Sequence, residues 1–336
     1  MEYSAAGQVQ DIINAADRIV IVQADNPDAD SLGSALALEH ILGELGKQPF
    51  LYCGVDMPTY LRYMTGWDRV SPDLPKQFDA SLIVDASTMT LFEKLQDSGQ
   101  QGWLASKPCA VLDHHETVEN LIPFATVTIN DPKRASTGEL IYYLAKQLDW
   151  KLPQAAQEFI MLSILGDTQG LTNQLASADT YRILAEFIDN GVDRSLLEEQ
   201  RREYGKMPLE IYRYKAELIK RTEFSADNRI ALVSIPQQEI NQFSPLYNPG
   251  PLIQGDMLQT AGIELAIVLK HYADGKITGA IRSNAGAPVA GRLAEHFGGG
   301  GHAFASGFKA LNKPLEQIKT EVLNFATELL DNDAVV

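Results

Sequence analysis

Several features that mark special classes of protein are scarce or missing in this chain of 336 residues. The two cysteines, Cys53 and Cys109, are too few for a disulfide framework. No apolar run reaches the length of a membrane-spanning helix, and the first residues contain no basic segment of a secretory signal. No internal repeat or low-complexity tract is evident. These absences predict a cytoplasmic protein that does not enter membranes.

Positive charge is also in short supply, because 28 Lys and Arg residues stand against 44 Asp and Glu residues, a net charge of −16. This balance disfavours the binding of long nucleic acid, which requires neutralisation of many phosphates. It is compatible with a short anionic substrate held at a local site, in particular one bridged by metal ions. The acidic excess lies mainly in the first two thirds of the chain, since residues 225–336 carry 8 basic and 11 acidic residues.

Short apolar runs alternate with helical segments in the first half of the chain, which predicts an α/β fold with a doubly wound, mostly parallel sheet. The strands are expected at residues 18–22, 49–53, 80–85, 111–113 and 124–129. The helices are expected at residues 5–16, 31–45, 136–148 and 153–165.

The length of the chain allows two domains. We expect a first domain at residues 1–192, a charged helical connector at 193–224 and a smaller α/β domain at 225–336. Asp274-Gly275 lies between two apolar runs of the second domain, and this dipeptide favours a hairpin turn.

Carboxylates follow several of the expected strands and helices at the point where the apolar run ends. Asp28 and Asp30 follow the first strand, and Asp85, Asp113 and Asp167 each follow a later run. Each alone is equally typical of a helix cap or a turn. Because parallel strands end at the same edge of a sheet, these carboxylates are expected to converge, which raises their pKa values unless cations compensate.

Histidine is rare, with six residues in the chain, yet His114 and His115 are adjacent and directly follow Asp113. Carboxylates combined with imidazole suit Mn²⁺ or Mg²⁺ better than a structural zinc site, which prefers thiolates. The sequence therefore predicts a centre for one or two such ions.

Four consecutive glycines, Gly298 to Gly301, precede His302 near the end of the chain. A glycine run costs backbone entropy and packs no side chain, so it favours a place where the backbone approaches a ligand closely. A flexible loop is the alternative, but it does not explain why the run ends in histidine and a strand of small residues. We therefore expect a loop that faces phosphate or nucleotide.

These motifs resemble those of a known family. Residues 26–34, Val84-Asp85, 113–115 and 166–168 are similar, in order, to the four motifs of the DHH phosphoesterases. The glycine run with Arg282 and Ser283 resembles the DHHA1 domain that follows in one branch of that family.

The segment Ala135–Glu139 is also similar to the NrnA-like oligoribonucleases of bacteria. The resemblance covers nearly the whole chain.

The resemblance implies a phosphoesterase with two metal ions, usually Mn²⁺, which clamp the attacking and leaving oxygens. It implies that Asp28 binds the first metal and Asp30 the second. Asp85 would bridge the two metals, and His114 and Asp167 would complete the second site.

The resemblance also assigns catalytic and substrate-binding residues. His115 would contact the phosphate, and Asp113 would orient the neighbouring histidines. Residues that would hold a phosphate or terminal nucleotide are Arg282, Ser283, Gly299, Gly300, Gly301 and His302. The implied substrates are very short RNA, 3′-phosphoadenosine 5′-phosphate, or linear and cyclic dinucleotides such as cyclic di-AMP. A homodimer is an oligomeric state that the sequence leaves open.

The chain departs from the family pattern at one position. The first motif normally begins with histidine three residues before the proline, and Ala24 occupies that position here. Gln23 and Asp25 flank it, but in an extended strand they point to other faces. A backbone shift could bring Asp25 in, and water could also fill the coordination position. We hypothesise that the first metal binds weakly while the second site remains intact.

This departure supports a second interpretation, a nucleotide-binding module with little hydrolytic activity. The retained Asp113, His114, His115 and Asp167 favour an enzyme instead. A pyrophosphatase or exopolyphosphatase would share the metal motifs, but the glycine run ending in His302 disfavours it, since those relatives usually carry a different C-terminal domain.

Overall fold

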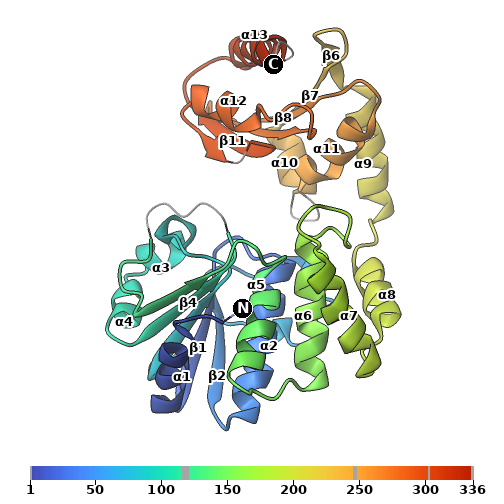
Figure 1. The fold of residues 1–336 in the computed structure, drawn as a ribbon. Helices are drawn as coiled ribbons and strands as arrows, with labels where there is room; N and C mark the ends of the chain where they lie inside the picture. Colours follow the sequence, from blue (N-terminus) through green and yellow to red (C-terminus); the bar gives the residue numbers. More distant parts are fainter. Residues whose placement is uncertain (1, 116–120, 245–247, 302, 334–336) are drawn as a thin grey trace. The chain divides into compact units, whose positions relative to one another are not determined.

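A computed structural model of the chain describes residues 2–115, 121–244, 248–301 and 303–333 (Figure 1). His302, expected in the ligand-facing loop, lies outside the described residues. The chain divides into two compact units, Met1–Lys206 and Met207–Val336. The division falls inside the expected connector, because helix α8 (Arg194–Tyr204) belongs to the first unit and helix α9 (Leu209–Lys220) to the second.

The first unit is built on a five-stranded sheet in the order β2-β1-β3-β4-β5, and all neighbouring strands are parallel. This confirms the expected doubly wound parallel sheet. The strands are β1 (Arg18–Gln23), β2 (Gln48–Cys53), β3 (Ala80–Val84), β4 (Cys109–Asp113) and β5 (Val127–Asn130).

Helices cover both faces of this sheet, and their apolar side chains form two cores. One core joins the sheet to α1 (Ala6–Ala15), α2 (Ala29–Glu44), α5 (Thr137–Gln147), α6 (Gln154–Asp167) and α7 (Ala178–Asp189). The other joins it to the short helices α3 (Glu93–Asp97) and α4 (Gln101–Ala105), which lie on the opposite side in Figure 1. Three short 3₁₀ turns lie at Thr59–Leu61, Trp67–Arg69 and Met89–Leu91.

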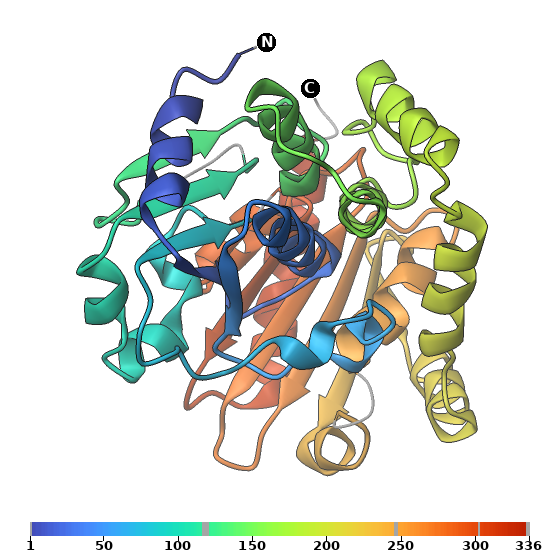
Figure 2. The same ribbon diagram turned by 90° about the horizontal axis from the view of Figure 1, so that it is seen from below.

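Helices α2 and α6 lie side by side and are seen almost end-on in Figure 2. Glycine permits this close approach, because a Cβ at Gly33 would lie 2.8 Å from the carbonyl oxygen of Phe159. At the other end of the contact, a Cβ at Gly166 would lie 2.7 Å from the Cβ of Ala29. The beginning of α2 and the end of α6 are thus brought together at the carboxyl edge of the sheet.

The second unit contains a mixed sheet in the order β10-β11-β9-β8-β7-β6, in which only the β7–β8 pair is parallel. Its strands are β6 (Glu223–Ser225), β7 (Ile230–Pro236), β8 (Leu265–His271), β9 (Ile277–Ser283), β10 (Gly300–Gly301) and β11 (Ala305–Ala310). One face packs against α12 (Ala290–His296) and α13 (Leu315–Asp333). The other packs against α9, α10 (Gln237–Phe243) and α11 (Pro249–Gln259).

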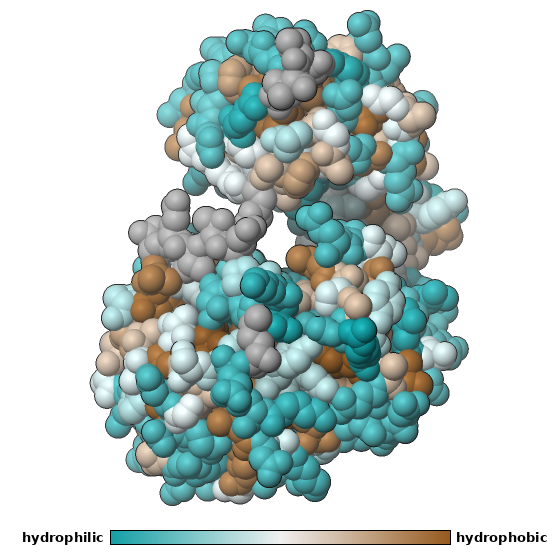
Figure 3. Space-filling view, viewed as in Figure 1, coloured by the Kyte–Doolittle hydropathy of each residue, from teal (hydrophilic) through white to brown (hydrophobic). Residues whose placement is uncertain are grey.

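The visible surface of the first unit is mostly hydrophilic, with single apolar residues scattered between polar ones (Figure 3). Among the described helices, none combines the length and the apolar character that crossing a membrane requires.

Candidate metal centre and active site

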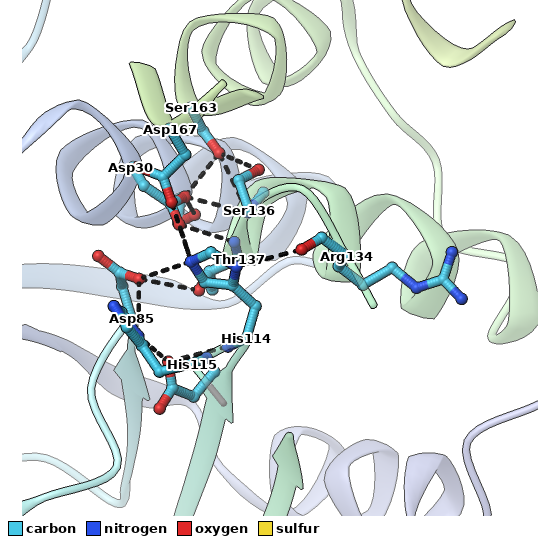
Figure 4. Close-up of polar contacts among 12 residues, drawn as sticks. Asp30, Asp85, His114, His115, Arg134, Ser136, Thr137, Ser163 and Asp167 are labelled. Carbon is cyan, nitrogen blue, oxygen red and sulfur yellow. Dashed lines mark hydrogen bonds and ion pairs between the residues drawn. The ribbon is translucent and has the colours of Figure 1, made fainter. Parts of the chain in front are cut away.

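The site is assembled at the carboxyl edge of the first unit's sheet, where β3 and β4 end (Figure 4). Asp85 directly follows β3 and has a φ of +59°, a left-handed conformation that aspartate adopts more readily than most residues. Its backbone N–H donates to the carbonyl of Leu112 on β4 (2.9 Å), and its Oδ1 accepts a hydrogen bond from the hydroxyl of Thr137 (3.2 Å).

The first turn of α2 supplies two more carboxylates. Asp28 caps this helix, and its Oδ1 accepts hydrogen bonds from the N–H groups of Asp30 and Ser31, both at 3.0 Å. Asp30 is fully buried, and its Oδ2 accepts from the N–H of Thr137 at 2.7 Å. Its Oδ1 accepts from the hydroxyl of Ser163 at 2.6 Å. Both carboxylates are therefore held in one orientation by the surrounding backbone and hydroxyl groups.

His114 follows β4 and lies at the centre of the cluster. Its Nδ1 lies 3.2 Å from the carbonyl oxygen of Arg134, an arrangement in which Nδ1 carries the proton and donates it. Its Nε2 lies 2.9 Å from an oxygen of Asp167, 3.4 Å from one of Asp30 and 3.7 Å from one of Asp85. Within the described part of the chain, this buried Nε2 makes no hydrogen bond of acceptable geometry.

His115 is turned toward Asp113. Its Nδ1 donates to Oδ1 of Asp113 at 2.7 Å, and the same oxygen accepts from the backbone N–H groups of His114 (2.8 Å) and His115 (3.3 Å). Asp113 is buried, whereas the side chain of His115 is 46% exposed. Asp113 thus fixes the ring of His115 and leaves its outer edge accessible.

Burial, followed by mutual repulsion, raises the pKa values of the carboxylates. Burial is the main reason that the pKa of Asp85 is raised well above its ordinary value, and nearby carboxylates, first of all Asp30, add to the effect. Burial and the charge of Asp30 also raise the pKa of Asp167 to about 6. The pKa of Asp28 is also raised, mainly by burial.

The histidines respond to these charges. Burial alone would lower the pKa of His114, but the carboxylates of Asp167 and Asp30 outweigh it and raise the pKa to about 9. The hydrogen bond to Asp113 raises the pKa of His115. Burial works in the opposite direction for Asp113, yet the bond from His115 holds its pKa below the ordinary range.

Two groups of side chains offer donor atoms that lie within 4.8 Å of one another, as a single ion requires. One consists of Asp30, His114 and Asp167, and the other of Asp85, His114 and His115. An imidazole nitrogen without a hydrogen bond, surrounded by mutually repelling carboxylates, fits a divalent cation such as Mn²⁺. Asp28, expected at the first metal, belongs to neither of these groups.

Among the described residues, neither group of donor atoms includes a side chain next to Ala24 that could replace the missing histidine. Ala24 is 4% exposed and packs in the apolar core on the α3 and α4 side of the sheet. Oδ2 of Asp25 accepts a hydrogen bond from the N–H of Lys94 at 2.8 Å, which holds this carboxylate beside α3. Gln23 is fully buried, and neither atom of its amide finds a described partner.

Two strands of the second unit carry four of the expected substrate-binding residues, with Arg282 and Ser283 on β9 and Gly300 and Gly301 on β10. Exposed Arg282 pairs in register with Ala305 of β11, which in turn neighbours β10 with its glycines. The hydroxyl of Ser283 donates to the carbonyl of Ala303 at 3.2 Å.

The glycines of this loop differ in their surroundings. A Cβ at Gly299 would lie 2.2 Å from the carbonyl oxygen of Gly307, and one at Gly301 would lie 2.6 Å from that of Ala305. Close strand packing therefore requires glycine at both positions. Of the three glycines Gly299, Gly300 and Gly301, only Gly300 faces open space, so backbone packing accounts for the other two.

Sequence reasoning did not find several residues that shape the centre. Thr137 contacts both Asp30 and Asp85, Ser163 contacts Asp30, and Arg134 provides the carbonyl for His114. Two of these contacts use backbone atoms, which leave no signature in residue type. The similarity of Ala135–Glu139 to a family segment was the one available signal.

Comparison with known proteins defines the class. Residues 18–166 match the DHH family, N-terminal domain. This segment holds all five strands of the first sheet and every residue of the centre except Asp167, so the first unit is similar to the DHH phosphoesterases, which are metal-dependent.

Particular relatives extend the similarity over most of the chain. It is 25% identical to the probable bifunctional oligoribonuclease and PAP phosphatase NrnA of Streptococcus mutans, over 88% of this chain and 90% of that protein. It is 26% identical to the bifunctional oligoribonuclease and PAP phosphatase NrnA of Bacillus subtilis, with the same coverage. The crystal structure of an exopolyphosphatase-related protein from Bacteroides fragilis shares the fold, with a TM-score of 0.83 and 23% identity over 98% of both chains. The domain and the named relatives support a nucleotide phosphoesterase.

Proposed function

We propose that the protein hydrolyses short oligoribonucleotides, 3′-phosphoadenosine 5′-phosphate, or linear and cyclic dinucleotides, with a divalent cation as cofactor. The observation that carries the proposal is the buried Nε2 of His114 among the carboxylates of Asp30, Asp85 and Asp167. The names of the NrnA relatives support short RNA and 3′-phosphoadenosine 5′-phosphate as the first substrates to test.

Mn²⁺ is the cation that we propose, with Mg²⁺ as the alternative, because both accept carboxylate oxygens and Mn²⁺ also accepts imidazole. Asp30, Asp85, His114 and Asp167 would hold it. When bound, the cation polarises a phosphoryl oxygen and lowers the pKa of water. A bound cation would offset the repulsion between the carboxylates and lower their pKa values, which favours their charged forms.

His115 has the properties of a phosphate-binding residue. The hydrogen bond from Nδ1 to Asp113 raises the pKa of His115, which favours the charged form of the ring. In that form, Nε2 would be a charged donor suited to a phosphate oxygen. Asp113 orients this ring rather than contacting substrate.

We further propose that the first metal position, at Asp28 and Asp85, is weakened. Ala24 brings no donor atom to it, and Oδ1 of Asp28 already accepts two backbone hydrogen bonds. This observation favours a second candidate function, a nucleotide-binding module with little hydrolytic activity.

In the second unit, Arg282, Ser283 and the residues of the glycine loop are proposed to hold a phosphate or terminal nucleotide. Arg282 is exposed on β9, and one strand, β11, separates it from the glycines of β10, which supports this role. A cytoplasmic location and a homodimer remain predictions.

An assay with Mn²⁺ tests the function against a panel of RNA of two to five nucleotides, 3′-phosphoadenosine 5′-phosphate, linear and cyclic di-AMP, and pyrophosphate. We expect turnover of one or more nucleotides and its loss in Asp30→Asn. Binding of nucleotides without any turnover would replace the proposal by the binding module. Turnover of pyrophosphate alone would replace it by a pyrophosphatase.

A further inference from the structure

A buried ion-pair network lies directly behind the metal centre, in the segment between β5 and α5. Arg134 is 8% exposed, and its Nε donates to Oδ2 of Asp131 at 2.8 Å. Its Nη1 lies 3.6 Å from Oε1 of Glu139, whose side chain is fully buried on the first turn of α5. The guanidinium also lies over the ring of Tyr143, 4.1 Å from its centre.

Further hydrogen bonds tie this network to distant parts of the first unit. The hydroxyl of Tyr3 donates to Asp131 at 3.1 Å, and the hydroxyl of Thr180 on α7 donates to Glu139 at 2.8 Å. Buried charges that are paired in this way hold one geometry, because breaking a pair leaves a desolvated charge without compensation. The two ion-pair partners of Arg134 are therefore themselves anchored, Asp131 to the N-terminal segment and Glu139 to α7.

The backbone of the same segment touches the metal-binding side chains. The carbonyl oxygen of Arg134 accepts from Nδ1 of His114 (3.2 Å), and the N–H of Thr137 donates to Asp30 (2.7 Å), as Figure 4 shows. A displacement of this segment would thus move the partners of two proposed ligands together.

We propose that Arg134 is a positioning residue for the metal centre. Its buried ion pairs fix the carbonyl that keeps the proton of His114 on Nδ1, so that the lone pair of Nε2 is directed at a divalent cation. This rests on the proposed function only in that the centre binds a cation. A purely structural role for Arg134 would change stability and leave both the tautomer and the metal affinity unchanged.

The tautomer of His114 in the wild-type protein is the first test. Protein labelled with ¹⁵N is loaded with Cd²⁺, a diamagnetic substitute for Mn²⁺, and the histidine nitrogens are assigned by long-range ¹H–¹⁵N correlation spectra. We expect the proton on Nδ1 and cadmium coupling to Nε2. A proton on Nε2 overturns the proposal whatever any variant does.

Metal affinity in a conservative variant is the second test. Arg134→Lys keeps the charge but loses the planar fork that reaches both Asp131 and Glu139. We expect Cd²⁺ and Mn²⁺ to bind about tenfold more weakly, the lower end of the effect of removing a residue that supports a ligand. The matched control is Arg69→Lys, which loosens an exposed pair with Glu39 and should leave affinity within about twofold.

Glu139→Gln keeps the proposal testable if Arg134→Lys does not fold. The amide can still accept from Thr180, but the charge opposite Arg134 is lost. We expect metal affinity to fall in this variant as well, by about tenfold at most. If Arg134→Lys and Glu139→Gln, or whichever of them folds, bind metal with wild-type affinity, the proposal is overturned. Because these measurements use no substrate, failure to hydrolyse nucleotides would count against the proposed function alone.

Discussion

At the scale of single residues, the centre brings several carboxylates close to one imidazole. The carboxylates repel one another, and the imidazole has one nitrogen available for a cation. His114 is held by one nitrogen and presents the other to Asp30, Asp85 and Asp167. The sequence predicted these residues from their position after apolar runs. It could not predict the contacts of Arg134 and Thr137, which depend on backbone atoms brought close only by the fold.

Metal binding should release a proton from His114. Its pKa of about 9 in the metal-free protein means that the ring is charged at pH 7 and must lose that proton before a cation can bind. We expect release of about one proton per ion at pH 7 and an affinity that rises with pH up to about 9. Calorimetry in two buffers of different ionisation enthalpy measures this number. Binding that is independent of pH between 6 and 9 would contradict it.

Restoring the family histidine should strengthen the first metal position. In Ala24→His, we expect tighter binding of a second Mn²⁺ and higher activity, since the variant restores the neutral imidazole ligand of the family pattern. Titration calorimetry and the assay measure both. If the wild-type protein already binds two ions tightly, position 24 is not limiting.

The buried amide of Gln23 allows a test of how much stability an unpaired polar group costs. Its amide is fully buried without a described partner, and such groups cost about 1–3 kcal/mol. Gln23→Leu should therefore raise the free energy of unfolding by about 1 kcal/mol. Urea denaturation measures this change. A loss of stability would indicate that the amide has a partner in solution.

At the scale of elements, the convergence of the carboxylates has two origins. Parallel β3 and β4 bring Asp85 and Asp113 to one edge, as the strand pattern predicted. Asp167 reaches the same edge from the last turn of α6, where the argument from strand ends does not apply. The close packing of α6 on α2 at Gly33 brings it there.

The contact between α2 and α6 predicts a contrast between two glycines of the same helix. Gly33→Ala places a Cβ within 2.8 Å of Phe159 and 3.2 Å of Ser163, so it should destabilise the protein by about 1–3 kcal/mol. It should also weaken metal binding, because Ser163 contacts Asp30. Gly43→Ala meets nothing within 4 Å and should be neutral or stabilising. Equal effects of the two substitutions on unfolding would contradict the packing argument.

At the scale of the whole molecule, chemistry and packing are divided between two compact units with separate cores. The proposed metal ligands all belong to the first unit. The glycine loop belongs to the second, and there sequence alone could not separate strand packing at Gly299 and Gly301 from contact with a ligand.

A divalent cation should accordingly stabilise the first unit alone. Bound at 100 times its dissociation constant, Mn²⁺ should add about 2.7 kcal/mol to the unfolding free energy of that unit. Scanning calorimetry with Mn²⁺ or with chelator measures the shift, which should vanish in His114→Ala. An equal shift in that variant would place the stabilising ion elsewhere.

The imidazole of His114 limits how many ions the centre can fully coordinate. His114 belongs to both groups of potential ligands, yet its Nδ1 is engaged by a carbonyl and a single lone pair remains on Nε2. One lone pair serves one ion at a time. The two groups therefore compete for the same imidazole, and an ion in one excludes full coordination in the other.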